Sequence, residues 1–195
     1  MPPLPPITQA LLLINTGVFC LQFLSGLWIE RLFALWPLSG GFLPWQVVSY
    51  AFLHGSVGHL FFNMLGLWMF GAELERIWGP KRFLQFYAAS VLAAALTQLL
   101  VTLNAAPYPT VGASGGLFGL LLAFAMMFPN RTIIPLFPPI PMKAKVFVAL
   151  YGALELMFGV FDPRSGIAHF AHLGGMAGGY LMIRYWRGQP PFGRR

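Results

Sequence analysis

Charge and cysteine are both scarce in this chain of 195 residues. Charged residues make up 9% of the sequence and hydrophobic residues 57%, whereas soluble domains carry roughly 25% charged residues. An ordinary soluble domain is therefore excluded, and the composition predicts a protein that crosses a membrane several times. The single cysteine, Cys20, excludes an intramolecular disulfide and leaves the redox compartment undetermined.

Basic residues outnumber acidic ones, but no basic run accompanies the net charge of +7. Binding of nucleic acid requires such clustering, so the charge does not indicate it. Residues 1–6 contain no Lys or Arg, and the apolar stretch that follows is too long for the apolar region of a signal peptide. We interpret this stretch as a retained first membrane span.

Prolines and turn residues separate six apolar segments. They predict an all-α fold, a bundle of six transmembrane helices in a single membrane domain of residues 1–187, followed by a short basic tail of residues 188–195. The predicted spans are approximately residues 7–28, 53–74, 83–103, 114–128, 146–161 and 167–186.

The fourth segment is short for a membrane span. It ends at Phe128, because Pro129 disfavours helix in the residue before it. A helix from Ser114 to Phe128 is about 22 Å long, and the hydrocarbon core of a bilayer is about 30 Å thick. The helix is thus predicted to begin inside the membrane with Ser114 at its N-terminal end. A hydroxyl there either bonds a neighbouring helix or faces a water-filled cavity.

The distribution of basic residues predicts the orientation of the chain. Ten of the 12 Lys and Arg fall in the second loop, the fourth loop and the C-terminal end, and only Arg31 and Arg164 fall on the other side. The ten are Arg76, Lys81, Arg82, Arg131, Lys143, Lys145, Arg184, Arg187, Arg194 and Arg195. The positive-inside rule then places both termini in the cytoplasm, with the loop before Ser114 on the outer side.

The first loop, residues 29–46, is rich in Trp, Leu and Pro. Such a composition suits a segment that lies in the headgroup region on the outer side. An ordinary connecting loop is the alternative.

The four histidines are predicted to lie at the same level of the membrane as Ser114. They are His54, His59, His169 and His172, at the outward ends of the second and sixth spans. Ionisable side chains at membrane depth are costly, so they are functional candidates by default. His169 is the exception, because packing or a supporting contact explains it better than chemistry does.

Glycines four residues apart predict that the fourth and sixth spans pack closely. The fourth span has Gly115 and Gly119, and the sixth has the overlapping pairs Gly174/Gly178 and Gly175/Gly179. Glycines at this spacing let two helix backbones approach each other. If these faces meet, the hydroxyl of Ser114 and the imidazole of His172 come within hydrogen-bonding reach.

A serine beside a histidine can perform acyl transfer. The histidine takes the proton of the hydroxyl, which makes the serine a nucleophile, so the rate is expected to rise with pH as the imidazole becomes neutral. Donors for the oxyanion are available in His59, in Asn63 four residues later, and in the backbone N–H of Ser114. No carboxylate is predicted at this level, so the unit is expected to be a dyad, and Glu155 in mid-span stays unexplained.

Three motifs together resemble the signatures of rhomboid intramembrane serine proteases. They are Gly112-Ala113-Ser114-Gly115, His59-x-x-x-Asn63 and Ala171-His172-Leu173-Gly174-Gly175, on the fourth, second and sixth predicted spans. The resemblance covers essentially the whole chain in the basic six-span form. It implies hydrolysis of a peptide bond in or near the transmembrane segment of a single-span membrane protein, within the lipid bilayer, with no cofactor, no metal and no nucleic-acid partner.

By position, the resemblance implies a role for each motif residue. Ser114 matches the nucleophile, His172 the general base, and His59 and Asn63 the oxyanion side chains. Supporting residues are His54, Gly112, Gly174 and Phe118, of which Phe118 matches an aromatic ring that packs on the base. Trp45 matches the Trp of a Trp-Arg pair in the first loop, but Gln46 replaces the Arg, which puts a loop-anchoring contact in doubt. The implied location is a bacterial inner membrane.

Two other functions compete with proteolysis. A catalytically inactive relative that acts as a binding factor would usually lack the serine or the histidine, and Ser114 and His172 are both present. A metal transporter that uses the four histidines would need acidic or thiol ligands near them, and none is evident in the sequence.

Overall fold

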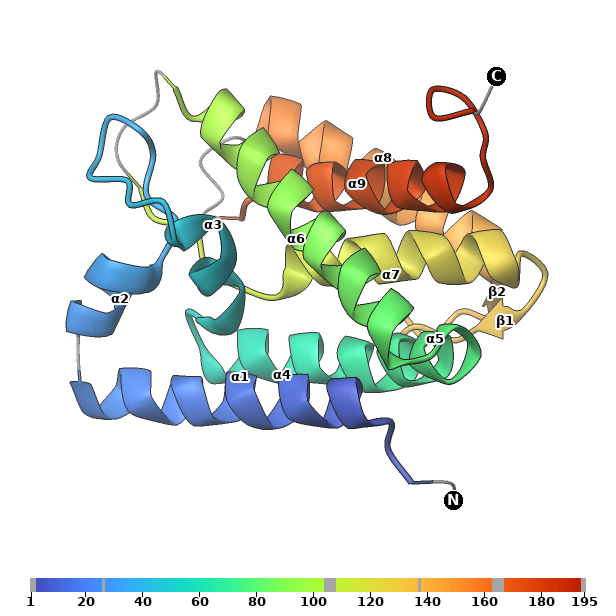
Figure 1. The fold of residues 1–195 in the computed structure, drawn as a ribbon, viewed down its shortest axis with the longest axis horizontal. Helices are drawn as coiled ribbons and strands as arrows, with labels where there is room; N and C mark the ends of the chain where they lie inside the picture. Colours follow the sequence, from blue (N-terminus) through green and yellow to red (C-terminus); the bar gives the residue numbers. More distant parts are fainter. Residues whose placement is uncertain (1–2, 26, 104–107, 137, 163–166, 194–195) are drawn as a thin grey trace.

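The computed structural model describes residues 3–25, 27–103, 108–136, 138–162 and 167–193. Helices dominate these residues (Figure 1). They are α1 (Pro6–Ser25), α2 (Leu27–Phe33), α3 (Gln46–Ser49), η1 (Tyr50–Phe52), α4 (Val57–Gly66), η2 (Leu67–Gly71), α5 (Ala72–Trp78), α6 (Pro80–Val101), α7 (Ser114–Met127), α8 (Ala144–Phe161) and α9 (His169–Trp186). Two short strands, β1 (Thr132–Ile133) and β2 (Met142–Lys143), pair antiparallel between α7 and α8.

Helix α7 begins at Ser114, as predicted, and several other helix ends differ by a few residues from the approximate bounds that we predicted. The first span ends at Ser25 and not at residue 28. The second begins at Val57 and not at residue 53, because Ser56 is extended and its hydroxyl caps the helix by accepting from the backbone N–H of His59. That helix also continues beyond residue 74, through the π-helical turn η2, to Trp78. The third begins at Pro80, because proline suits the first turn of a helix.

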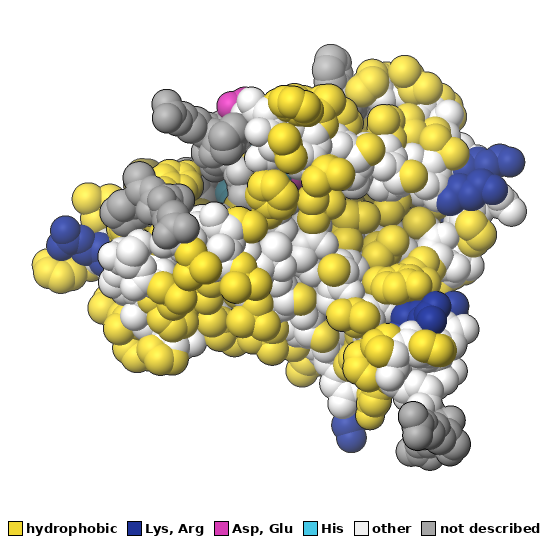
Figure 2. All heavy atoms as spheres, turned by 90° about the horizontal axis from the view of Figure 1, so that it is seen from above, with side chains coloured by type: hydrophobic (Ala, Val, Ile, Leu, Met, Phe, Trp, Pro, Cys, Tyr) yellow, Lys and Arg dark blue, Asp and Glu magenta, His cyan; other side chains and the backbone are white. Residues whose placement is uncertain are grey.

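The outer surface of the bundle is that of a membrane protein. Helices α1, α6 and α8 are long and apolar enough to cross a bilayer. Large apolar side chains face outward, as Phe23 (86% exposed) and Phe161 (82%) illustrate, and Figure 2 shows hydrophobic side chains over most of the visible face. The fold is therefore a helical membrane bundle, whereas the count of six crossings stays a prediction.

Most basic side chains on the face shown in Figure 2 gather toward one end of the bundle, on the right of that view. There the Arg76 guanidinium donates to the carbonyl oxygen of Pro3, and Arg131 forms an ion pair with Glu73. The Arg82 guanidinium lies over the ring of Trp186, 5.9 Å from its centre. The N-terminal segment, the end of α5, the start of α6 and the end of α9 thus meet at this end. Such an arrangement is what the positive-inside prediction requires, and the orientation in a membrane itself stays a prediction.

Helices α6, α7 and α9 form the centre of the bundle, and glycines bring them together. A Cβ atom on Gly175 would overlap the carbonyl oxygen of Gly115 and lie 2.7 Å from its carbon, so α7 and α9 touch through their backbones. Gly174 faces α6 instead, where a Cβ would lie 2.6 Å from the Cβ of Thr97. The predicted approach of the fourth and sixth spans is confirmed by these contacts.

The first loop is attached to the protein more tightly than a segment lying in the headgroups would be. Leu35 pairs with Thr110 in a β-bridge, and the Gln46 side chain is fully buried. Gln46 Oε1 accepts from the backbone N–H of Trp36 and Leu43, and Nε2 donates to the carbonyl of Leu32. In α2, by contrast, no residue is buried, so this part of the loop presents its apolar side chains outward.

Candidate active site

The loop before α7 places Ser114 at the first residue of a buried helix. Gly112 has φ +125°, a conformation that residues with a Cβ rarely adopt. A Cβ there would also lie 2.7 Å from the Cε1 and Nε2 atoms of His59. The N–H of Gly112 donates to the carbonyl of Tyr50 at 2.9 Å. Only glycine therefore allows the chain to turn into α7 this close to the imidazole of His59.

The side chains of Ser114 and His172 meet across the contact between α7 and α9. Ser114 Oγ lies 2.7 Å from Nε2 of His172, and the ring of Phe118 stacks on the imidazole of His172 with centres 4.3 Å apart and planes 5° apart. Phe118 stands four residues after Ser114, so one face of α7 carries both the hydroxyl and the ring that holds the imidazole in place. The ring contact is the one that the resemblance implied.

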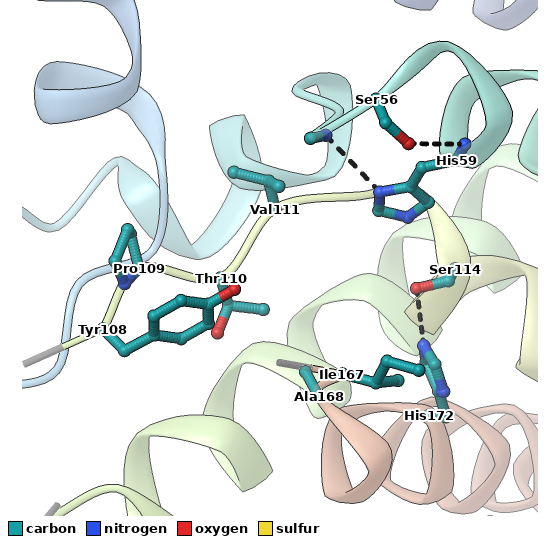
Figure 3. A pocket seen from close by; sticks show the side chains of 11 residues that line it. Ser56, His59, Tyr108, Pro109, Thr110, Val111, Ser114, Ile167, Ala168 and His172 are labelled. Carbon is teal, nitrogen blue, oxygen red and sulfur yellow. Dashed lines mark hydrogen bonds between the residues drawn. The ribbon is translucent and has the colours of Figure 1, made fainter. Parts of the chain in front are cut away.

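A cavity of about 440 Å³ opens beside this pair (Figure 3). Its lining comes from the start of α4, the loop before α7 and the start of α9: Gly55, Ser56, His59, Tyr108, Pro109, Thr110, Val111, Ser114, Ile167, Ala168 and His172. Polar atoms of His59, Ser114 and His172 thus face one space. A peptide segment that entered this space would meet the hydroxyl and both imidazoles.

His59 is oriented to donate a hydrogen bond into the cavity. Its Nδ1 accepts from the backbone N–H of Gly55 at 3.4 Å, so in the neutral ring the proton is on Nε2. The Nε2 atom is on the side of the ring that faces Gly112. The imidazole of His59 therefore lies in the lining of the same cavity as Ser114 and His172.

Asn63 and His54 lie near this site but do not line the cavity. Asn63 is one turn after His59 on α4, is 5% exposed, and its Nδ2 has no hydrogen-bond partner among the described residues. His54 was predicted to have a supporting role. It is 2% exposed, its ring centre lies 5.1 Å from that of His59, and its backbone bonds the side chain of Gln22 on α1. His54 therefore supports the position of His59 from behind.

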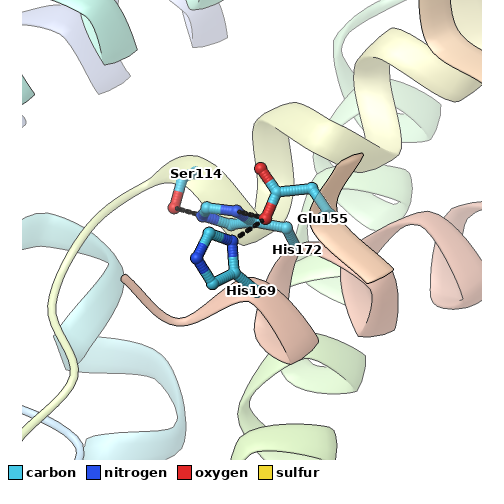
Figure 4. A network of polar contacts seen from close by, with 4 residues as sticks. All are labelled: Ser114, Glu155, His169 and His172. Atoms are coloured by element: carbon cyan, nitrogen blue, oxygen red, sulfur yellow. Dashed lines mark hydrogen bonds and ion pairs between the residues drawn. The ribbon is translucent and has the colours of Figure 1, made fainter. Parts of the chain in front are cut away.

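Glu155 corrects the expectation that no carboxylate is near the histidines (Figure 4). Its Oε2 lies 2.9 Å from Nδ1 of His172 and 2.7 Å from Nδ1 of His169. From its place in the sequence, Glu155 was predicted to lie in the middle of its span, away from the histidines. In the structure, the imidazoles of His169 and His172 extend from the first turn of α9, and the Glu155 side chain extends from α8 to contact them. The signal that could have found it was present, because a carboxyl in an apolar span marks a functional candidate.

Gly174 and Trp45 occupy structural positions. Gly174 packs α9 on α6 two residues after His172. The indole N–H of Trp45 donates to the carbonyl of Leu32 at 2.9 Å, beside the buried side chain of Gln46. The loop-anchoring contact that the absence of an arginine put in doubt is thus supplied by an amide.

Comparison with known proteins gives one consistent result. Residues 42–188 match the family model of the Rhomboid domain. The chain is 34% identical over 184 residues to Rhomboid protein 1, mitochondrial, of Saccharomyces cerevisiae, which covers 90% of this chain and 51% of that protein. It is 34% identical over 143 residues to Rhomboid protease GluP of Bacillus subtilis (70% of this chain, 25% of that protein). It is 28% identical over 180 residues to Rhomboid protease GlpG of Klebsiella pneumoniae (91% and 62%).

The similarity extends over the whole candidate site. The matched residues 42–188 include His59, Ser114, Glu155 and His172. The chain spans between 25% and 62% of the length of these three relatives. Because they come from bacteria and from a mitochondrion, the bacterial inner membrane stays a prediction.

Proposed function

Because the chain belongs to the rhomboid family, we propose that it is an intramembrane serine endopeptidase. It hydrolyses a peptide bond in or near the transmembrane segment of single-span membrane proteins. The observation that carries the proposal is the 2.7 Å contact between Ser114 Oγ and His172 Nε2 beside a cavity inside a membrane protein. Two of the relatives carry the word protease in their names.

In the first half of the reaction, Ser114 is the nucleophile. His172 Nε2 takes the hydroxyl proton as Oγ attacks the carbonyl carbon of the substrate. The carbonyl oxygen becomes an oxyanion, which accepts hydrogen bonds from the N–H of Ser114 at the N-terminus of α7 and from His59 Nε2. Asn63 Nδ2, buried and without a described partner, is the third donor once the substrate is seated. The protonated His172 then gives its proton to the leaving amine.

In the second half, water hydrolyses the acyl-enzyme. His172 takes a proton from water, the hydroxide attacks the ester carbon, and the same donors hold the new oxyanion. The proton returns to Ser114 Oγ as the carboxylic acid product leaves. No metal or organic cofactor takes part in this scheme, and the substrate binds from the bilayer.

Orientation in the membrane is part of the proposal. Both termini are cytoplasmic, and the site opens toward the outer side, because the loop before α7 that lines the cavity lies away from the ends of α5 and α9, where the basic residues are (Figure 1).

Cleavage of a single-span substrate tests the proposal. The purified chain in lipid vesicles is compared with Ser114→Ala and His172→Ala, and with Ser25→Ala at the exposed end of α1 as the matched control. We expect no cleavage with the first two variants and unchanged cleavage with the control. Cleavage by either site variant would refute the assigned roles. Substrate that can be crosslinked to the wild type without being cleaved would favour an inactive binding protein, and stoichiometric zinc in the purified protein would favour a metal transporter.

A further inference from the structure

Glu155 is a polar group at the candidate site that the proposed reaction leaves unused. It stands on α8, its side chain is 14% exposed, and its Oε2 contacts both His172 and His169 (Figure 4). Among the described residues no Lys or Arg contacts it. A carboxylate at membrane depth is costly without compensation, so the two imidazoles are what holds this group in place.

We propose that Glu155 is a positioning residue that orients His172, which makes the reacting unit a Ser-His-Glu triad instead of a dyad. The inference rests on the proposed function and deepens it. The three groups lie in series: Ser114 Oγ is 2.7 Å from Nε2 of His172, and Nδ1 of the same ring is 2.9 Å from Glu155 Oε2. Both ring nitrogens are therefore engaged, one by the nucleophile and one by the carboxylate.

The carboxylate selects the tautomer that the reaction requires. An ionised carboxylate only accepts hydrogen bonds, and two imidazole nitrogens converge on the same oxygen of Glu155. Both nitrogens must then donate, which places the proton of neutral His172 on Nδ1 and leaves Nε2 with a lone pair toward Ser114. A glutamine could present its NH₂ group to Nδ1 and favour the opposite tautomer.

The carboxylate also stabilises the charge that develops during the reaction. When His172 takes the proton of Ser114 it becomes an imidazolium, and a negative charge 2.9 Å from Nδ1 favours that state. A hydrogen bond to a charged group contributes enough to correspond to about a 10- to 100-fold effect on rate. Phe118 stacks on the face of the His172 ring. The hydrogen bonds at the ring nitrogens thus fix the imidazole within its plane, and the stacking contact restrains movement perpendicular to that plane.

Hydrogen bonds explain the distances better than a bound metal ion does. The side-chain N and O atoms of Glu155, His169 and His172 that could bind a metal lie within 4.8 Å of one another. A metal centre is therefore the alternative explanation of this cluster. Tetrahedral zinc with bonds of about 2.0–2.1 Å keeps its ligand atoms about 3.3 Å apart. The two N···O distances here are 2.7 and 2.9 Å, the length of charge-assisted hydrogen bonds.

The test compares Glu155→Gln and Glu155→Asp with Glu73→Gln, a matched control whose carboxylate pairs with Arg131 at the basic end. Cleavage by full-length protein in vesicles is measured from pH 5 to 9, with kcat and KM determined separately. We expect kcat of Glu155→Gln to fall about 10- to 100-fold with little change in KM, and Glu155→Asp to recover part of the loss. The control is expected to match the wild type.

The pH profile separates orientation of the base from simple packing of α8 on α9. The titratable groups that face His172 are Glu155 on α8, His169 on α9 and His59 on α4. Removing the negative charge disfavours the imidazolium, so the acid limb of the Glu155→Gln profile should move to lower pH. The same shift should appear in a His169→Gln background, because Glu155 contacts His172 directly. A Glu155→Gln variant with wild-type kcat and an unmoved acid limb would overturn the proposal.

Nitrogen NMR of ¹⁵N-histidine in the Ser114→Ala protein reads the tautomer without any turnover. We expect His172 to carry its proton on Nδ1 and to lose that preference when Glu155→Gln is added. The opposite tautomer in Ser114→Ala alone would refute the proposal, and so would loss of wild-type activity after dialysis against a chelator. If no substrate is ever cleaved, the proposed function fails while this measurement still decides the role of Glu155.

Discussion

Replacing Gly175 by alanine should separate the two halves of the candidate site without touching either reacting side chain. The added Cβ would overlap the carbonyl oxygen of Gly115 and lie 2.7 Å from its carbon, whereas carbon atoms in contact are about 3.5–4.0 Å apart. Both atoms belong to helix backbone, so no side chain can rotate away. Helices α7 and α9 must therefore move apart by about 1 Å.

A displacement of this size is large compared with the tolerance of the Ser114–His172 contact. The distance of 2.7 Å would grow to about 3.7 Å, beyond hydrogen-bonding range. Misplacing reacting groups by about 1 Å costs about 10²-fold in rate, and overpacking of this kind costs about 1–3 kcal/mol in stability. We expect Gly175→Ala to remain folded and to lose at least about 10²-fold in cleavage rate.

The assay is cleavage of a fluorescent single-span substrate in vesicles, with thermal unfolding measured on the same preparations. Gly152→Ala is the matched control, because its Cβ would face α9 too but would meet only the flexible end of Met176, 3.4 Å away. A Gly175→Ala variant that keeps more than half of the wild-type rate would show that the backbone contact does not set the distance between the two side chains.

Two further predictions follow from the loop before α7 and from the basic end of the bundle. In Gly112→Ala, residue 112 must adopt φ +125° with its Cβ against the ring of His59. We therefore expect a loss of about 10²-fold in cleavage rate, or a displacement of the His59 ring visible by NMR. An unchanged rate would contradict the role of His59 as a donor. The Glu75 carboxylate accepts hydrogen bonds from the backbone N–H groups of Ile7 and Thr8 and from the Thr8 hydroxyl at the start of α1. Glu75→Gln should therefore lower the unfolding free energy by about 1–3 kcal/mol without changing kcat. Denaturation in detergent measures the first quantity and the cleavage assay the second.

Much of the candidate site could be predicted from spacing alone. Gly115 and Gly175 each belong to a glycine pair with a separation of four, and that period places both members on one helix face. From this, the approach of Ser114 to His172 followed, and the structure confirms it at 2.7 Å. The all-helical membrane fold followed from composition in the same way, because long apolar segments with few charges are typical of transmembrane helices.

Ends of helices and contacts between distant segments were predicted less well. The second span begins at Val57 because Ser56 caps it, and a cap is a local feature that hydropathy does not register. The burial of His54 behind His59 depends on α1, since Gln22 holds the backbone of His54. Neither contact has a periodic signature along the chain.

The sequence by itself determined the class of the protein, its family and the pair Ser114 and His172. The length of the apolar segments, the distribution of charge and the spacing of the glycines can all be read from the order of the residues, because none of them depends on how the helices pack. Only the tertiary structure decided the place of Glu155. Whether a carboxyl on α8 reaches an imidazole on α9 depends on the rotation and depth of one helix against another, and packing sets both of these. A side chain that looked isolated in its own span therefore stands 2.9 Å from His172 in the folded chain.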